Sequence, residues 1–427
     1  MTSCVLKDLI EISKDGEWGK GEPFDDSVEM LAIRGTDFEG ARFGVLDSVP
    51  RRNVAKRIAE RKTLKPWDLL IEAAGGTKNQ ITGRTVLLRP QLFERSELPI
   101  TCASFSRFIR FRRDNCDAEF MFWYLQYLYG AGFMHAYHTQ HTGVSRFQWT
   151  TFSEREPLTL PPLSVQRRIA GVLSAYDELI ENNQRRVRIL EEMARALYRE
   201  WFVNFRVPGH EKVKLVPSAL GPVPQGWEVK EMRHIAEVID CLHSKKPAED
   251  PDGPGILLQL NNIGEGGKLD MRETFRISAE NYALWTSRIE LRYGDCIITN
   301  VGRVAAVAQI PEGVRAAPGR NMTAVRPRVG CLTPTFLLEY LLSPHMASEV
   351  GKKKDLGTIM DSLNVKGIVR LNVPCPPMAL MERFEQAVQP IRRRIELLIQ
   401  QSENLRCTRD LLLPRLLAGQ LQLVSNM

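Results

Sequence analysis

The residues that come nearest to metal-dependent chemistry are Asp68 and Glu72, in the stretch PWDLLIEAAGGTK. Two carboxylates close together in a sequence of this kind can hold a metal ion that cleaves a phosphodiester. A nuclease site of this kind carries a lysine two residues after the glutamate, and here that lysine is absent. A similar stretch later in the chain has Thr299 in place of Glu72. We therefore interpret Asp68, and its later counterpart Asp295, as residues at which a strand begins.

Three histidines form a second candidate for metal binding, at positions 135, 138 and 141 in HAYHTQH. On a helix the third imidazole would point well away from the first, which makes a poor metal-binding face. The corresponding region of the second half of the chain has lysines instead. A polar or basic loop is the favoured interpretation, and we predict no metal site.

Sequence motifs for nucleotide and methyl-group chemistry are also missing. There is no G-x-x-x-x-G-K-[ST] phosphate loop, which argues against ATP hydrolysis by that route. There is no Asn-Pro-Pro-aromatic tetrapeptide of the kind that holds the adenine amino group in N6 methyltransferases. The sequence therefore predicts a chain that is not an enzyme and that binds no cofactor of its own.

Composition indicates an ordered protein of the reducing cytoplasm. The chain has 427 residues, 43% of them hydrophobic, and such a length favours about three domains. Its apolar stretches are shorter than the ~20 residues needed to span a bilayer, and the N-terminus lacks the features of a secretion signal. Eight cysteines are dispersed without a C-x-x-C pair, which suits buried thiols better than disulfides or a zinc site.

Positive charge is the remaining chemical signal. The formal net charge is +7 and the pI is about 9.0, which mildly favours a polyanionic partner. Each basic cluster alone is more commonly a solvated surface, but basic clusters occur in both halves of the chain, and this favours DNA. Basic and amide side chains contact phosphates and read base edges. The predicted DNA-binding residues are Arg51, Arg52, Lys56, Arg57, Lys78, Asn79, Gln80, Arg84, Arg107, Arg146, Arg303, Arg320, Lys352, Lys353 and Lys354.

The chain contains an internal duplication. When Pro161 is placed on Pro376, an offset of 215 residues, the apolar positions coincide without gaps as far as Phe202. A repeat of this length indicates duplicated domains rather than a solenoid. Three weaker matches follow upstream in the same order: residues 120–128 with 336–344, residues 64–76 with 291–303, and residues 9–12 with 235–238.

Each copy ends in a long amphipathic helix that follows a pair of prolines. In the first helix the apolar residues recur at steps of three and four from Ile169 to Trp201, a heptad seam with one stutter. Such a rod cannot bury its apolar stripe alone, which favours pairing of the two helices over packing of each on its own globular domain. The predicted partner-docking residues are Tyr176, Leu179, Leu190, Leu197, Trp201, Phe202, Leu405, Leu412 and Leu416.

These observations predict an α+β fold with two pseudo-repeated mixed α/β domains separated by two long antiparallel coiled-coil helices. Pro390 falls inside the second helix and is expected to kink or delay it. The predicted ranges are 1–158 for the first recognition domain, 159–206 for the central helix, 207–228 for a Pro/Gly-rich linker, 229–373 for the second recognition domain and 374–420 for the C-terminal helix.

Three segments resemble one known family. The run from Leu160 to Phe202 is similar to the central helical region of type I restriction–modification specificity subunits. PSALGPVPQGWEV resembles the segment that opens their second target recognition domain, and LLLPRLLAGQLQL resembles their closing segment. The resemblance covers essentially the whole chain, including its duplication.

The resemblance implies a DNA-binding subunit without a catalytic centre. Each recognition domain would read one half of a split DNA sequence, and the helices would set the spacing. Two methylation subunits, which use S-adenosylmethionine, would dock on the chain, and restriction subunits that use ATP and Mg²⁺ would join them. No residue code for base reading transfers from the family. A coiled-coil scaffold or orphan subunit that organises partners without reading DNA is the alternative.

Overall fold

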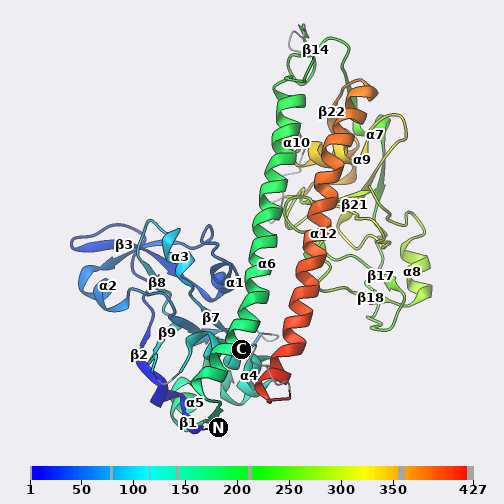
Figure 1. Cartoon of the computed structure of the whole chain (residues 1–427). Helices are drawn as coiled ribbons and strands as arrows, with labels where there is room; N and C mark the ends of the chain where they lie inside the picture. The colour runs from blue at the N-terminus through cyan, green and yellow to red at the C-terminus, as the bar shows by residue number, and fades with distance from the viewer. Residues whose placement is uncertain are drawn as a thin grey trace, which may run out of the picture. The chain divides into compact units, whose positions relative to one another are not determined.

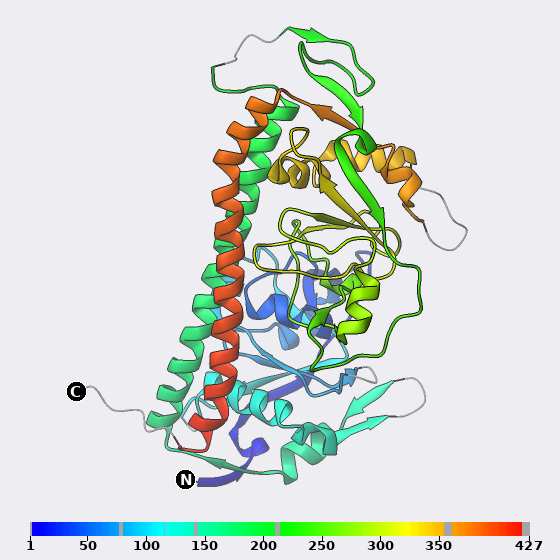
Figure 2. The same ribbon diagram turned by 90° about the vertical axis from the view of Figure 1, so that its right-hand side faces the viewer.

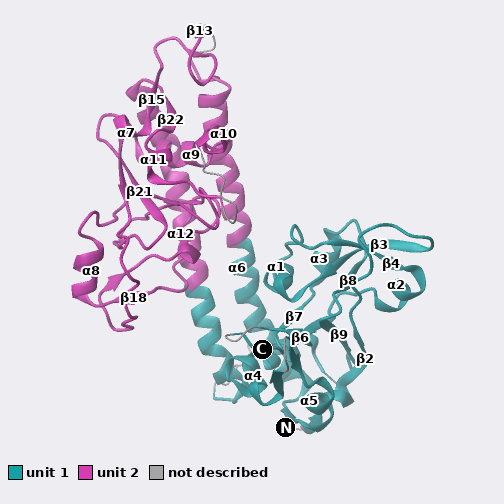
Figure 3. Ribbon diagram, turned by 180° about the vertical axis from the view of Figure 1, so that it is seen from behind, with its two compact units in different colours: residues 1–182, 404–427 teal, residues 183–403 magenta. Residues whose placement is uncertain are grey.

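The computed structural model describes residues 2–76, 80–114, 116–140, 144–209, 214–353 and 361–420. The chain divides into two compact units, which Figure 3 distinguishes by colour. Unit 1 consists of Met1–Asn182 together with Asn404–Met427, and unit 2 consists of Asn183–Glu403. Because the boundary falls inside both long helices, each unit contains one globular part and a stretch of each helix.

Unit 1 is built on a four-stranded antiparallel sheet with the order β2-β9-β5-β7. A smaller sheet, β4-β3-β8, contains a parallel pair, and a third sheet has the order β10-β11-β6. Strand β1 pairs with β12, directly before the first long helix. The strands are β1 Thr2–Val5, β2 Ile10–Asp15, β3 Ser27–Ile33, β4 Arg51–Ala55, β5 Leu69–Glu72, β6 Ala74–Gly75, β7 Thr85–Leu87, β8 Ile100–Cys102, β9 Ser106–Phe111, β10 His138–Gln140, β11 Ser145–Phe147 and β12 Pro157–Leu160.

The longest helix of the globular part of unit 1 is α4, Ala118–Gly130, which is apolar on most of its surface and lies in the interior. Six of its side chains are buried, Trp123 among them, and the N-cap Asp117 accepts the backbone N–H of Phe120. Its neighbours in the same core come from the first long helix and from the end of the second. The α-helices of this part are α1 Phe38–Arg42, α2 Lys56–Lys62, α3 Pro90–Glu94, α4 Ala118–Gly130 and α5 Trp149–Arg155.

Unit 2 repeats the central sheet of unit 1, here with the order β16-β21-β19-β20. Strand β15 pairs with β22 directly before the second long helix, as β1 and β12 do in unit 1. The elements are β13 Leu215–Val216, β14 Val223–Pro224, β15 Glu228–Glu231, α7 Met232–Ile235, β16 Ala236–Asp240, β17 Gly255–Ile256, β18 Arg276–Ile277, α8 Ala279–Trp285, β19 Cys296–Thr299, β20 Val307–Gln309, β21 Met322–Pro327, α9 Pro334–Leu341, α10 Pro344–Lys353, α11 Val365–Ile368 and β22 Asn372–Cys375.

The duplication and the fold class predicted from the sequence are confirmed. Strand β2 begins at Ile10 and β16 at Ala236, the offset that the sequence comparison indicated. Their partner strands are also equivalent, because Ile10 pairs with Phe111 and Ala236 with Pro327. Helices α4 and α9 likewise occupy the stretches that match in sequence. Over the described residues, no helix is long and apolar enough to cross a membrane.

The two long helices are α6, Leu163–Tyr198, which continues as a π-turn to Val203, and α12, Met378–Leu417. They run antiparallel and side by side in both views (Figures 1 and 2). In unit 2, Val187 of α6 packs in one apolar cluster with Ile395 and Leu398 of α12. In unit 1, Leu413 and Leu416 of α12 share a core with Ile169 and Leu173 of α6.

The sequence places Leu179 on the packing seam of α6, and this is wrong. Leu179 is 53% exposed, whereas its neighbour Ile180 is fully buried. The buried stripe runs through Leu173, Asp177 and Ile180, because the carboxylate of Asp177 faces inward. Because Asp177 is polar, the apolar pattern of the sequence favours Leu179 and follows the wrong side of the helix for one turn.

In each unit, a buried charge on one of the long helices pairs with the globular part of that unit. In unit 1, Asp177 accepts hydrogen bonds from Arg42 of α1 at 2.8 Å and from Arg409 of α12 at 2.5 Å. In unit 2, Arg392 of α12 donates to Glu339 of α9 at 2.7 Å. Asp177 and Arg392 are equivalent positions of the repeat but carry opposite charges.

Pro390 does not delay the second helix. Helix α12 begins at Met378, directly after Pro376-Pro377, just as α6 begins at Leu163 after its own pair of prolines. Pro390 lies in the interior of α12, where it can donate no hydrogen bond to the carbonyl four residues earlier. The helix nonetheless continues for 40 residues, because its apolar stripe is buried on both sides of the proline.

The same Asp–Arg ion pair links two neighbouring strands in the central sheet of each unit. Asp68, directly before β5, accepts two hydrogen bonds from Arg110 of β9, at 2.8 and 2.7 Å. Asp295, directly before β19, accepts two from Arg326 of β21, at 2.8 and 2.6 Å. Both carboxylates also accept a backbone N–H three residues upstream. Asp68 and Asp295 are thus strand-entry residues, as predicted, and neither resembles a metal ligand.

Removing the arginine of such a pair is expected to destabilise its unit strongly. In Arg110→Met the Asp68 carboxylate, whose side chain is 0% exposed, would keep its desolvation cost without its partner. The expected loss is about 3–5 kcal/mol in the free energy of unfolding. Denaturant titration of the full chain, followed by circular dichroism, measures it, and Arg326→Met should have a similar effect.

The control for this measurement is Arg315→Met, because Arg315 and its partner Glu290 form an exposed pair. Its expected effect is below about 1 kcal/mol. The double variant Asp68→Asn/Arg110→Met removes the charge together with its partner and should recover much of the loss. A small effect of Arg110→Met would show that the pair does not hold the sheet.

Candidate nucleic-acid interface

The basic cluster of residues 51–62 lies on β4 and α2 of unit 1. Arg51 is largely exposed, and its guanidinium stands 3.9 Å from the carboxylate of Glu29. Lys56 and Arg57 are exposed on α2. Arg52 differs, because it donates to the carbonyl of Trp18 at 3.1 Å and lies over the Trp18 ring. Three of the four predicted side chains are therefore placed to reach a phosphate backbone, while Arg52 holds Trp18.

A groove of about 740 Å³ in unit 1 brings two predicted arginines together. Arg146 is exposed on β11 at one side of it. Arg107 on β9 pairs with Asp15 at 2.7 Å and lies over the ring of Trp149. Phe105, which the sequence analysis did not identify, lines the same groove and is 57% exposed. Positive charge, aromatic faces and hydrogen-bonding groups thus meet on one surface.

The remaining predicted residues of unit 1 belong to the loop after β6. Gln80 is exposed there, whereas Lys78 and Asn79 lie outside the described residues. Arg84 donates two hydrogen bonds to Glu72, at 2.9 and 2.8 Å. The hydrogen bond to Glu72 raises the pKa of Arg84. Because Glu72 is neutralised in this way, it is no ligand for a cleavage metal, and Arg84 has fewer donors left for DNA.

In unit 2 the predicted residues fall at two places. Arg303 and Arg320 are exposed on the loops that follow β19 and precede β21, and Arg303 also donates to the carbonyl of Ile263 at 2.8 Å. Lys352 and Lys353 end α10, where both donate to the buried carboxylate of Glu349. Lys354 lies outside the described residues. The lysine pair is therefore largely neutralised within the chain.

The predicted partner-docking residues divide into interior and accessible side chains. Phe202 is fully buried against Phe336 and Phe384, and Trp201 is 8% exposed in the same core of unit 2. Leu416 is buried in the core of unit 1. Tyr176, Leu190, Leu197, Leu405 and Leu412 are half-buried along the helices. Leu179 is exposed, as are four apolar side chains that the sequence analysis did not single out: Ile189, Met193, Leu397 and Leu411.

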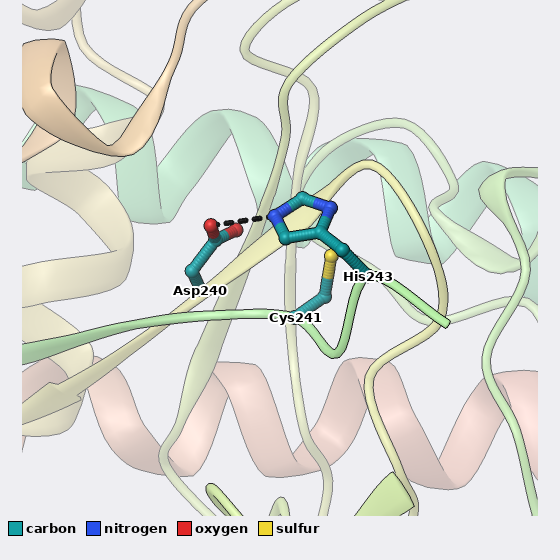
Figure 4. Close-up of side chains that lie close together, drawn as sticks. All are labelled: Asp240, Cys241 and His243. Carbon is teal, nitrogen blue, oxygen red and sulfur yellow. Dashed lines mark hydrogen bonds and ion pairs between the residues drawn. The ribbon is translucent and has the colours of Figure 1, made fainter.

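Among the described residues, one group of side chains has the composition of a cation site: Asp240, Cys241 and His243 (Figure 4). His243 is hydrogen-bonded to Asp240 at 2.7 Å. Burial raises the pKa of the Cys241 thiol, which disfavours the thiolate that a metal requires. Arg288 donates to the carbonyl of Cys241 and adds positive charge. These features disfavour cation binding. The three residues lie at the C-terminal end of β16.

Comparisons with known proteins place this arrangement in context. No protein-family model matches the chain. It is 26% identical over 307 residues to the type I restriction enzyme MjaIX specificity subunit of Methanocaldococcus jannaschii, covering 70% of this chain and 69% of that protein. It is 24% identical over 298 residues to the MjaVIII specificity subunit of the same organism, covering 68% and 67%.

The fold is that of a type I restriction–modification S subunit. The crystal structure of the S subunit from M. genitalium superposes with a TM-score of 0.54 and 15% identity, over 99% of this chain and 96% of that one. The sequence relatives are specificity subunits as well. The resemblance to type I specificity subunits found in the sequence is thereby confirmed.

The Glu349 cluster leads to a pH-dependent prediction. Burial opposes ionisation of Glu349, but hydrogen bonds from Lys353, Lys352 and the Asn372 N–H outweigh it and lower the pKa to about 2. Because the folded pKa lies below the unfolded value of about 4.3, the stabilisation is present above that pH and is lost as the pH falls toward about 2. Glu349→Gln should cost at most about 3 kcal/mol near neutral pH, and less below about pH 4.

Urea titrations of both proteins between pH 7 and pH 2.5 would measure this difference. The control is Glu154→Gln, which removes the partner of Lys7 in an exposed pair and should change stability by less than about 1 kcal/mol. A Glu349→Gln difference that stays constant over the whole pH range would contradict the assigned role of the ionised carboxylate.

Proposed function

We propose that this chain is the DNA-specificity subunit of a type I restriction–modification complex. The observation that carries the proposal is the duplicated unit: one sheet order, one Asp–Arg pair and one proline-led long helix, each present twice. Two copies of one domain suit a target with two separate half-sites. The similarity to specificity subunits over about two thirds of the chain supports the same function.

In this proposal the globular part of each unit reads one half-site, and the long helices determine the unread gap between them. Methylation subunits, two in number, dock on the chain and supply S-adenosylmethionine-dependent modification of adenine N6. Restriction subunits add ATP- and Mg²⁺-dependent translocation and cleavage. The chain itself contributes no catalytic group and acts in the cytoplasm.

The exposed apolar side chains of the helices support a docking role. Leu179, Ile189 and Met193 of α6, and Leu397 and Leu411 of α12, are between 48% and 67% exposed. Ile189 and Met193 are four residues apart on α6, so they lie next to each other on the helix surface and can form one apolar contact for another protein. A scaffold that binds partners without reading DNA would use the same residues. Genes for a methylation and a restriction subunit beside this gene favour the specificity subunit, and the DNA measurements that follow separate the two functions directly.

The first test removes the exposed cations of β4 and α2. In Arg51→Ala/Lys56→Ala/Arg57→Ala, the affinity for every DNA sequence should fall. The slope of log K against log salt should become shallower by up to about 2.7, because each phosphate contact contributes about 0.9. Arg52 is kept, since its replacement would release Trp18. Fluorescence anisotropy at several salt concentrations, with methylation subunits present, provides the measurement.

The matched control removes three exposed cations that lie outside β4 and α2: Lys7→Ala/Lys230→Ala/Arg315→Ala. These residues pair with Glu154, Glu228 and Glu290, and the net charge changes equally in both variants. The control should retain the salt slope of the wild type. Equal slopes in the two triple variants would mean that β4 and α2 do not face DNA.

The second test lengthens the helices at the boundary between the units. Four residues inserted between positions 182 and 183, and four between 403 and 404, add one turn of about 6 Å to each helix. The unread gap of the target should grow by one or two base pairs, at about 3.4 Å per pair, and both half-sites should stay the same. Methylome sequencing of cells that carry the variant reports the motif. Altered half-sites with an unaltered gap would exclude the helices as the spacer.

A further inference from the structure

The two units present the same turn at the same end of their central sheets. Glu72 of β5 pairs with Ser106, and Thr299 of β19 pairs with Met322. The residues that precede these partners therefore correspond, so that Ser104-Phe105 of unit 1 matches Arg320-Asn321 of unit 2. The hydrogen bonds agree as well, because Ala73 donates its N–H to the carbonyl of Phe105 at 2.8 Å and Asn300 donates to Asn321 at 2.8 Å. We call the two turns the reading turns.

Both reading turns are held rigidly by neighbouring backbone. A Cβ atom on Gly319, directly before Arg320, would lie 1.8 Å from the carbonyl oxygen of Leu258. In unit 1, a Cβ atom on Gly16 would lie 2.2 Å from the carbonyl of Ala103, directly before Ser104. Asn321 adopts a φ of 62°, a conformation that few residues other than glycine tolerate and that asparagine accepts best. Residues in such sparsely populated backbone conformations are common at binding sites, where the surrounding structure fixes their geometry.

The side chains on the reading turns point outward and differ in chemistry between the units. In unit 1, Phe105 is 57% exposed beside the exposed Arg146. In unit 2, Arg320 and Asn321 are both exposed, and Arg303 is exposed on the adjoining loop. Within the described parts of the chain, the guanidinium of Arg320 makes no ion pair or side-chain hydrogen bond. The exposed ring of Phe105 and the unengaged guanidinium of Arg320 are therefore free to contact a ligand from turns whose backbone is fixed.

We propose that the reading turns carry the base-reading side chains of the two recognition domains. The geometry of the arginine fork suits the O6 and N7 atoms of guanine, and an asparagine amide suits N6 and N7 of adenine. Phe105 offers an apolar contact, which suits the methyl group of thymine. Unit 2 therefore reads purine edges through Arg320 and Asn321, and unit 1 reads a thymine-containing step through Phe105. The cations of β4 and α2 contact phosphates and carry no sequence information. This inference rests on the proposed function.

The test compares methylated motifs in cells that express the complete system with wild-type or variant chains. Arg320→Ala and Asn321→Gly should each relax one position of the half-site that unit 2 reads, and Phe105→Ala one position of the other half-site. Discrimination at the relaxed position should fall on the order of tenfold to hundredfold. Glycine is chosen at position 321 because it keeps the positive φ. The controls Arg315→Ala and Val329→Ala alter other exposed residues of unit 2 and should preserve the motif.

Binding measurements on the purified complex keep the test independent of expression level. Oligonucleotides with one substituted base are compared with the intact target for each variant. Arg320→Lys keeps the charge but loses the fork, and it should lower discrimination nearly as much as Arg320→Ala. If Arg320→Ala weakens binding to all oligonucleotides equally and leaves discrimination unchanged, Arg320 is a phosphate contact and the inference fails.

Other results overturn the inference in distinguishable ways. An unchanged motif in all three variants, with wild-type affinity, excludes the reading turns as the reading surface. A weakened assembly with the methylation subunit and an unchanged motif would make Phe105 a protein-docking residue. If the wild-type system itself yields no two-part methylated motif, the proposed function fails first. If the wild-type system yields a two-part motif and the variants leave it unchanged, only the assignment of these side chains is excluded, and the proposed function stands.

Discussion

The structure depends on one constraint: neither long helix can bury its apolar stripe without the other. Helix α6 packs against α12 in unit 2 through Val187, Ile395 and Leu398, and in unit 1 through the core that contains Leu173 and Leu416. Each globular part is attached to this pair rather than only to its own helix. The pairing thereby ties residues that are more than two hundred positions apart, and it explains why both units contain a stretch of both helices.

Opposite charges at equivalent helix positions determine which helix each globular part packs against. Asp177 on α6 is held by Arg42 and Arg409, whereas the equivalent Arg392 on α12 is held by Glu339. If a globular part docked on the wrong helix, it would place like charges together in a buried environment, and buried charges without partners are strongly unfavourable. The duplicated domains share one fold, but each is matched to one helix.

The sequence was sufficient to predict the repeat, the helix starts and the roles of Asp68 and Asp295, because these follow from local pattern and from order along the chain. It could not reveal their partners Arg110 and Arg326, which lie about forty and thirty residues away on a neighbouring strand. The buried Asp177 broke the apolar pattern and misplaced Leu179. Glu349, three and four residues before the two lysines, was visible as a helical ion-pair signal. The reading turns depend on strand register, which no local pattern specifies.

The discontinuity of unit 1 affects the order in which the chain can fold during synthesis. Unit 2 is continuous, from Asn183 to Glu403, whereas unit 1 needs residues from Asn404 onward to complete its core. Arg409 follows Asp177 by 232 positions, so a ribosome has already produced all of unit 2 before this contact can form. The first domain therefore cannot complete its core, and the side of α6 that α12 covers stays exposed, until the last turns of α12 emerge. A nascent chain with an uncovered apolar helix is a natural client for chaperones.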